Sequence, residues 1–355
     1  MKERKHYIEG LKGLAALLVF GSHFKLTFLN SSSLFSNNIF LSFITDGSFA
    51  VYIFLLLSGY CVSLSLDRVE SVLPLRGYAL KRYLRIALPI APIILVEGLL
   101  YLTGCFGYHD VLVHLQSNDI AMQAYTDLSF NGWVQAIFLS PIGKCSGWLD
   151  PTWMMKYIFF GSFVVLVLKL SINRTSKICT LLILSLSIII LALSSLYFVA
   201  VVMGCCIFEG KKAFHILDIK WCKSLSFAFM LIALFAYYFH LHKIVPATSL
   251  VIGVELSSVS QNLLSWGIFR KLGAISFPLY LIHWPLICTF SLWLYKSSYS
   301  VFNESSTLVV FIVTLLVLLL LSYLFSRYVE SKLNHSVVPL ICYRFFDDDQ
   351  SSVSS

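Results

Sequence analysis

The chain has 355 residues, of which 58% are hydrophobic and only 12% carry a charge. A soluble domain carries charge on about a quarter of its residues, so this composition excludes an ordinary soluble protein. The formal net charge of +8 does not indicate a nucleic-acid site, because membrane proteins collect Lys and Arg in their cytoplasmic loops. We therefore expect membrane lipids, and no nucleic acid, among its partners.

The N-terminal segment combines basic residues with an apolar run, as a signal peptide does. No small-residue cleavage site follows the run, and His23 and Lys25 end it. We expect this segment to remain in the protein as its first transmembrane helix.

Apolar runs between charged breaks predict about ten transmembrane helices. A helix needs about 20 apolar residues to cross the hydrocarbon core, and the sequence lacks the alternating segments of a membrane barrel. We expect spans at 8–28, 39–65, 86–106, 151–169, 178–193, 195–209, 224–240, 244–266, 272–294 and 306–326. The run over 178–209 is too long for one span at about 1.5 Å a residue, so we expect a turn at Ser194 and Ser195.

The basic residues predict the orientation of these spans. With both termini in the cytoplasm, 20 of the 26 Lys and Arg fall in or beside cytoplasmic segments, and such a bias sets topology. We expect an all-α polytopic membrane helix bundle over residues 1–335 and a cytoplasmic, disordered tail over 336–355, which is acidic at 347–349. The polar segment 107–150 is expected to be a long outside loop.

Two ionisable residues of the first span share one helix face. Lys12 and His23 are separated by three helical turns, about 16 Å along the axis, and Glu9 lies close enough to pair with Lys12. Ionisable groups inside a membrane often mark functional sites. The alternative is a Lys that reaches the interface and a His that hydrogen-bonds a neighbouring helix.

The ninth span carries a second polar stripe. Ser276, Tyr280 and His283 follow the spacing of one helix face, and His283 lies at a depth similar to that of His23, so the two imidazoles could meet. The alternative is structural, because Pro278 and Pro285 free backbone carbonyls that these side chains could satisfy.

A basic cluster precedes the third span. It consists of Arg76, Lys81, Arg82 and Arg85. Sorting of positive charge to the cytoplasm explains such a cluster without a ligand, yet it could equally bind a phosphorylated cytosolic compound. Glu97 lies about 18 Å deeper along the same helix, as an unexplained carboxylate within an apolar run.

The nine cysteines show no metal-ligand spacing, so we expect no metal site. Cys105 and Cys145 flank the expected outside loop and could form a disulfide, although a buried thiol often serves as a small apolar side chain.

Four segments of the chain resemble the acyltransferase 3 family. IEGLKGLAALLVFGSHF is similar to its opening signature, SFAVYIFLLLSGY to its second-span motif, LKRYLRIALP to its basic third-span entry, and ISFPLYLIHWPL to its late His-Pro motif. The segments occur in the family's order over residues 8–290, and the family also has ten spans. One motif alone is weak, whereas four in order are specific.

The resemblance implies transfer of an acyl group, usually acetyl, from cytosolic acetyl-CoA to a hydroxyl of a cell-envelope polysaccharide or its lipid-linked precursor. It implies a multi-pass protein of a bacterial inner membrane, with acetyl-CoA as co-substrate and no permanently bound cofactor. We assign catalysis to His23, Lys12 and Glu9, and acyl-CoA binding to Arg82, Arg85, Lys81 and Arg76. The residues expected to support the substrates are Ser58, Tyr60, Glu97, Tyr280 and His283.

Two positions depart from the family pattern. Lys12 stands where members usually have Arg, which keeps the charge but loses the guanidinium fork. Ile158 stands where members often have Glu. These departures leave open an altered acceptor or a catalytically inactive relative. A transporter or flippase, in which buried His and Glu relay protons, is the alternative from another class, although the sequence shows no internal inverted repeat.

Overall fold

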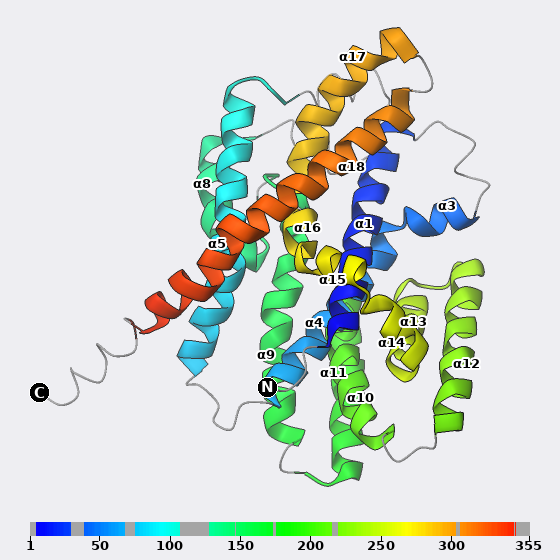
Figure 1. The fold of residues 1–355 in the computed structure, drawn as a ribbon. Coiled ribbons are helices and arrows are strands. Elements are labelled where there is room, and N and C mark those ends of the chain that lie inside the picture. Colours follow the sequence, from blue (N-terminus) through cyan, green and yellow to red (C-terminus); the bar gives the residue numbers. More distant parts are fainter. Residues whose placement is uncertain are drawn as a thin grey trace, which may run out of the picture. The chain divides into compact units, whose positions relative to one another are not determined.

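The computed structural model of the protein describes residues 5–29, 39–67, 75–106, 128–145, 147–172, 175–214, 219–302, 306–343 and 345 (Figure 1). Regular structure in these residues is helical throughout, which confirms the all-α class. The first half contains α1 (His6–Phe28), α3 (Ile39–Ile44), α4 (Gly47–Leu66), α5 (Leu75–Leu102), α8 (Phe130–Leu139), η2 (Ser140–Ile142), η3 (Asp150–Met154) and α9 (Met155–Ile172). The second half contains α10 (Lys177–Ala192), α11 (Leu196–Phe214), α12 (Ile219–Tyr238), α13 (Ile244–Leu256), α14 (Ser258–Leu264), α15 (Gly267–Ala274), α16 (Ser276–Leu286), η4 (Ile287–Ser291), α17 (Leu292–Phe302), α18 (Ser306–Phe325), η6 (Ser326–Glu330) and η7 (Leu333–Val337).

Seven helices among the described residues are long and apolar enough to cross a membrane. An eighth is counted if α13 and α14, which are bent by 97° at Ser257, form one broken span. The expected turn between α10 and α11 is present, and Ser195 N donates to Leu191 O at 2.8 Å. Helix α10 has only 16 residues and α11 carries Glu209 and Lys211 near its end, so neither is among the seven. The total of ten spans stays a prediction.

The chain divides into two compact units. The first comprises Met1–Val19, Ser42–Ser71 and Tyr157–Ala274, and the second comprises Phe20–Leu41, Val72–Lys156 and Ile275–Ser355. Helix α1 contributes to both, because its first part belongs to the first unit and its last part to the second. Lys12 is therefore a residue of the first unit and His23 a residue of the second.

The core of the first unit is the contact between α4 and α11, which glycine makes possible. A Cβ atom at Gly59 would lie 1.8 Å from the carbonyl oxygen of Val201, and one at Gly204 would lie 1.9 Å from that of Leu56. Membrane helices rely on such small residues because close packing, rather than a hydrophobic effect, holds them together. The two backbones are therefore in direct contact.

Two ionic clusters lie at opposite ends of α4. At its N-terminus, Asp46 caps Phe49 N at 2.8 Å and accepts from Lys243 Nζ, also at 2.8 Å. At its C-terminus, the buried Lys169 contacts Asp67 at 3.1 Å and also Glu209. The 20 residues between the clusters span about 30 Å, which is the thickness of the hydrocarbon core. The charges therefore lie where the apolar layer would end.

The second unit contains α5, α8, α16 and α18. Helix α8 packs along α5, where Trp133 Nε1 donates to Ile94 O at 2.8 Å and Tyr83 Oη donates to Phe138 O at 2.6 Å. Residues 83–94 of α5 belong to a candidate span, so α8 lies beside that span instead of projecting from it. This corrects the expectation that 107–150 is wholly an outside loop. Helix α8 packs there because its apolar residues need a packing partner. Residues 107–127 of the expected loop lie outside the described part.

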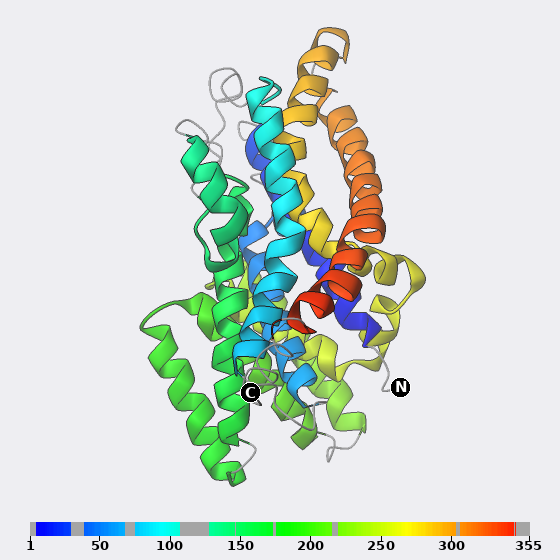
Figure 2. The ribbon, with the colours of Figure 1, turned by 90° about the vertical axis from the view of Figure 1, so that its left-hand side faces the viewer.

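The last helix extends further than the sequence predicts. Helix α18 continues through the π-helical segments η6 and η7 to Tyr343, so the continuous helix Ser306–Tyr343 has 38 residues. Its final part crosses α5 (Figures 1 and 2). The expected boundary at residue 335 therefore falls inside this helix, and most of the expected tail lies outside the described residues.

The close contact between α4 and α11 predicts a specific instability. Gly204→Ala should lower the stability of the protein by about 1–3 kcal/mol, because the new methyl group meets a backbone carbonyl that cannot rotate away. Thermal unfolding of the detergent-solubilised protein measures the effect. Gly267→Ala is the matched control, since a Cβ atom there has no neighbour within 4 Å. Equal stability of the two variants would contradict the packing.

The predicted orientation can be checked with two native cysteines. Cys105 and Cys179 are both exposed, and they follow α5 and begin α10 respectively, so we expect them on opposite sides of the membrane. A membrane-impermeant maleimide applied outside intact cells should label a variant that keeps only Cys105. It should not label one that keeps only Cys179. The reverse pattern would invert the topology.

Cys145 offers an internal control for this labelling. Burial raises the pKa of its thiol, so less thiolate is present at neutral pH and alkylation is slower. A variant that keeps only Cys145 should therefore react more slowly than one that keeps only Cys105, even in solubilised protein.

Candidate functional site

Two imidazoles meet in the second unit. The ring of His23 on α1 lies 5.3 Å from that of His283 on α16, between centroids, and 5.0 Å from that of Trp284. His283 and Trp284 are completely buried, and His23 is half-buried. The described residues place no polar side chain in hydrogen-bond distance of the His283 ring, and its polar surroundings are the backbone of Leu279 and Tyr280 on its own helix. The pairing expected from their similar depths is therefore present, with a buried imidazole beside a more accessible one.

Helix α16 is held in place by groups outside its own backbone. Tyr280 is buried and donates its hydroxyl to the carbonyl of Pro151 in η3. After Pro285 the helix widens into the π-helical segment η4, where Ser291 Oγ lies 2.9 Å from Thr314 Oγ1 of α18. The structural alternative, in which Tyr280 satisfies a carbonyl freed by proline in its own helix, does not describe this contact.

The basic residues expected to bind a phosphorylated compound all lie on the first three turns of α5. Arg76 and Arg85 are exposed, whereas Lys81 and Arg82 are half-buried. The Arg82 guanidinium lies 5.9 Å from the centre of the Tyr78 ring, and its Nε and one terminal nitrogen have no hydrogen-bond partner among the described residues. A half-buried guanidinium with open donors suits an anionic ligand, such as a phosphate.

Glu97 lies deeper on the same helix and is completely buried. The adjacent Gly98 faces the indole of Trp133, which a Cβ atom at that position would meet at 2.3 Å. The carboxylate therefore lies beside the contact between α5 and α8, about 18 Å along the helix from Arg85.

The expected catalytic partners of His23 on the first part of α1 belong to the first unit. Lys12 is half-buried, and its Nζ donates to Cys61 Sγ at 3.2 Å. Glu9 lies 3.5 Å from His6 Nδ1, and its expected pairing with Lys12 stays a prediction. Lys12 and His23 both belong to helix α1, and their sharing of one face stays a prediction.

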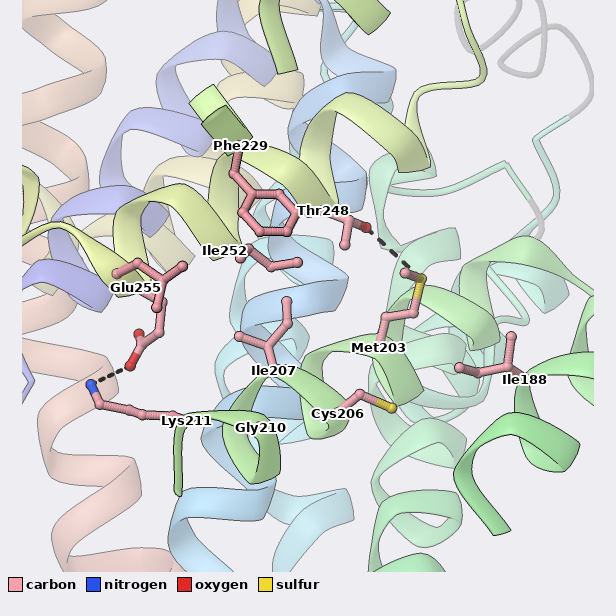
Figure 3. Close-up of a pocket in the computed structure, with 11 residues that line it drawn as sticks. Ile188, Met203, Cys206, Ile207, Gly210, Lys211, Phe229, Thr248, Ile252 and Glu255 are labelled. Carbon is pink, nitrogen blue, oxygen red and sulfur yellow. Dashed lines mark hydrogen bonds and ion pairs between the residues drawn. The ribbon is translucent and has the colours of Figure 1, made fainter. Parts of the chain in front are cut away.

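The two support residues of the second-span motif lie on α4. Ser58 is half-buried, and Tyr60 is buried with its hydroxyl 2.9 Å from Glu255 Oε1. Glu255 also accepts from Tyr7 at 2.6 Å and pairs with Lys211 (Figure 3). Sequence reasoning did not single out Glu255, although a lone carboxylate in the apolar run 244–256 is the same signal that identified Glu97.

An apolar groove of about 500 Å³ lies among α5, α16 and α18. Ile282, Pro285 and Leu286 of α16 and Thr289 of η4 line it from one side, on the face adjacent to the one that presents His283. Pro92 and Val96 line it from α5, and Leu321 and Phe325 from α18.

The described cysteines and possible metal-ligating side chains form neither a disulfide nor a metal site. Cys105 and Cys145 are thiols and not a disulfide. Among the described residues no group of three or more His, Cys, Asp and Glu side chains is arranged to hold a metal ion.

A family model described as an acyltransferase domain matches residues 5–327. The chain belongs to the acyltransferase 3 family. It is a multi-pass membrane acyltransferase, and its four motif segments lie on α1, α4, α5 and α16 of the structure. No curated protein and no solved structure matches the chain. The family assignment therefore rests on the family model, whereas the contact between His23 and His283 is seen in the structure.

Proposed function

We propose that this acyltransferase moves an acyl group, acetyl in the simplest case, from cytosolic acyl-CoA to a hydroxyl of a cell-envelope polysaccharide or of its lipid-linked precursor. The observation that carries the proposal is the contact between His23 and His283. A reaction that removes a proton from a hydroxyl needs a base, and imidazole is the side chain best suited to that role near neutral pH.

His23 acts as the general base, since it is the more accessible of the two imidazoles. Its ring nitrogen takes the proton of the acceptor hydroxyl while the oxygen attacks the thioester carbonyl carbon. The C–S bond then breaks, the CoA thiolate leaves, and the imidazolium returns its proton to the sulfur. The products are the ester and CoA, and His23 regains its initial state.

His283 positions His23. It is completely buried against His23, and the indole of Trp284 contacts the His23 ring edge-on. Fixing the ring of a general base in one orientation lowers the entropy lost on reaching the transition state. The bond from Tyr280 to the Pro151 carbonyl fixes α16, and with it His283.

The basic residues of α5 bind the phosphates of the donor. Arg82 and Arg85 lie one turn apart on the helix, Lys81 is adjacent, and Arg76 precedes them. Arginine binds phosphate through two parallel N–H groups, which a partly buried guanidinium with open donors can supply. Lys12 keeps on α1 the positive charge that Arg usually supplies in the family.

Removal of the base should abolish the chemistry. His23→Ala should reduce the transfer of labelled acetyl from acetyl-CoA to an envelope glycan by about 10²–10⁴-fold, the usual range for a general base, with normal membrane insertion. Lys12→Arg should keep the activity or raise it, because it retains the charge and restores the fork. Membrane preparations of each variant provide the measurement.

His335→Ala is the matched control, since this exposed histidine lies on η7 and hydrogen-bonds only its own helix. It should transfer acetyl like the wild type. Acetyl transfer that survives His23→Ala would overturn the mechanism.

The donor site has its own test. Arg85→Ala should weaken CoA binding roughly ten- to hundredfold, since one charge-assisted contact contributes about 1.5–3 kcal/mol. Arg327→Ala is the control, because it removes the same charge from an exposed arginine that donates a hydrogen bond to Tyr323 of its own helix. If the properly inserted Arg85→Ala protein binds CoA as tightly as the control, the basic cluster only orients the helix in the membrane and does not bind the donor.

A further inference from the structure

A second pocket, unrelated to the histidine pair, lies in the first unit. It has a volume of about 210 Å³ and is bordered by α10, α11, α12 and α13. Met203, Ile207, Phe229 and Ile252 make its walls apolar, and the ion pair of Lys211 and Glu255 closes one end (Figure 3). The pocket therefore combines a long apolar interior with a charge at one end.

The dimensions of the pocket suit a chain and not a compact solute. Its lining extends from Met203 to Lys211 along α11 and from Thr248 to Leu256 along α13. Each stretch of nine residues rises about 12 Å. The helices that border it at the sides, α10 and α12, expose apolar residues such as Leu186, Ile189, Phe227 and Leu231. In a membrane protein, exposed residues of this kind face lipid, so the pocket lies next to a source of acyl chains.

The charges at the end of the pocket favour an anionic headgroup. Glu255 is buried and accepts hydrogen bonds from Tyr7 and Tyr60. It is also contacted by two ammonium groups, Lys211 and, at 3.9 Å, Lys5. Glu255 therefore keeps three partners if Lys211 turns to another anion. Lys211 is only partly buried, with 29% of its side chain exposed, so it can make that change.

We infer that this pocket binds one acyl chain of an anionic membrane phospholipid, whose phosphate is contacted by Lys211. The chain lies along α11 and α13, and the headgroup lies near the C-terminal ends of both helices. A zwitterionic lipid has the same chain but lacks the net negative charge, so it should bind more weakly. The inference does not depend on the acyl-transfer reaction.

Native mass spectrometry of the full chain in detergent tests the inference, with equimolar phosphatidylglycerol and phosphatidylethanolamine of identical chains. The wild type should retain phosphatidylglycerol about fivefold better, the effect expected of one lysine near an anionic headgroup. Lys211→Met should remove this preference. Cys206→Phe, which fills the pocket, should reduce the retention of both lipids.

The matched controls lie outside the pocket. Lys223→Met removes an exposed lysine of α12, and Thr289→Phe adds the same phenyl ring to the separate groove of the second unit. Both should retain the wild-type preference. Glu255→Gln keeps acceptor and donor groups for the two tyrosines but removes the negative charge, so its preference for phosphatidylglycerol should exceed that of the wild type.

Equal retention of the two lipids by the wild type would overturn the inference. A wild-type preference in Lys211→Met would also overturn it, and so would wild-type retention of both lipids by Cys206→Phe. Acetyl transfer by the same preparations separates the two proposals, because a preparation that transfers acetyl but shows no lipid preference contradicts only the lipid site.

Discussion

Several charged groups among the described residues are held in ion pairs and clusters at the ends of helices. The two ends of α4 show the constraint most clearly, since Asp46 with Lys243 and Asp67 with Lys169 are separated by a helix of 20 residues. An unpaired charge in the apolar layer costs several kcal/mol, so such clusters fix the depth of each helix. The close packing of α4 and α11 through Gly59 and Gly204 then becomes possible without a polar group between them.

Because a charged or polar group in the apolar layer is costly, the polar groups that remain there are candidates for function. His283 is completely buried and adjoins a second imidazole instead of an ion partner. Burying such a group costs stability, and groups of this kind are concentrated at functional sites. The family to which the chain belongs carries out acyl transfer. The histidine pair and the basic residues of α5 both belong to the second unit, so one unit holds the proposed base and the proposed donor site.

Much of this could be predicted from the sequence, for identifiable reasons. Apolar run length predicts helices, and the turn at Ser194 and Ser195 follows from the excess length of the run around it. Helical spacing and depth also predicted that His23 and His283 could meet. The position of α8 could not be predicted. It depends on the hydrogen bond from Trp133 to Ile94, which joins segments far apart in the sequence. Glu255 was missed because its partners, Tyr7, Tyr60 and Lys211, come from three other helices.

The most direct measurement compares the acetyl content of envelope glycans from cells that contain the protein with that from cells that lack it, under identical growth. If the protein is an acyltransferase with a working histidine pair, at least one glycan from cells that contain it should carry an ester-linked acetyl group, which mild alkali removes. The same position should carry no acetyl group in cells that lack the protein. A transporter or an inactive relative predicts the same acetyl content in both. Identical acetyl content in every glycan fraction would contradict the proposed function.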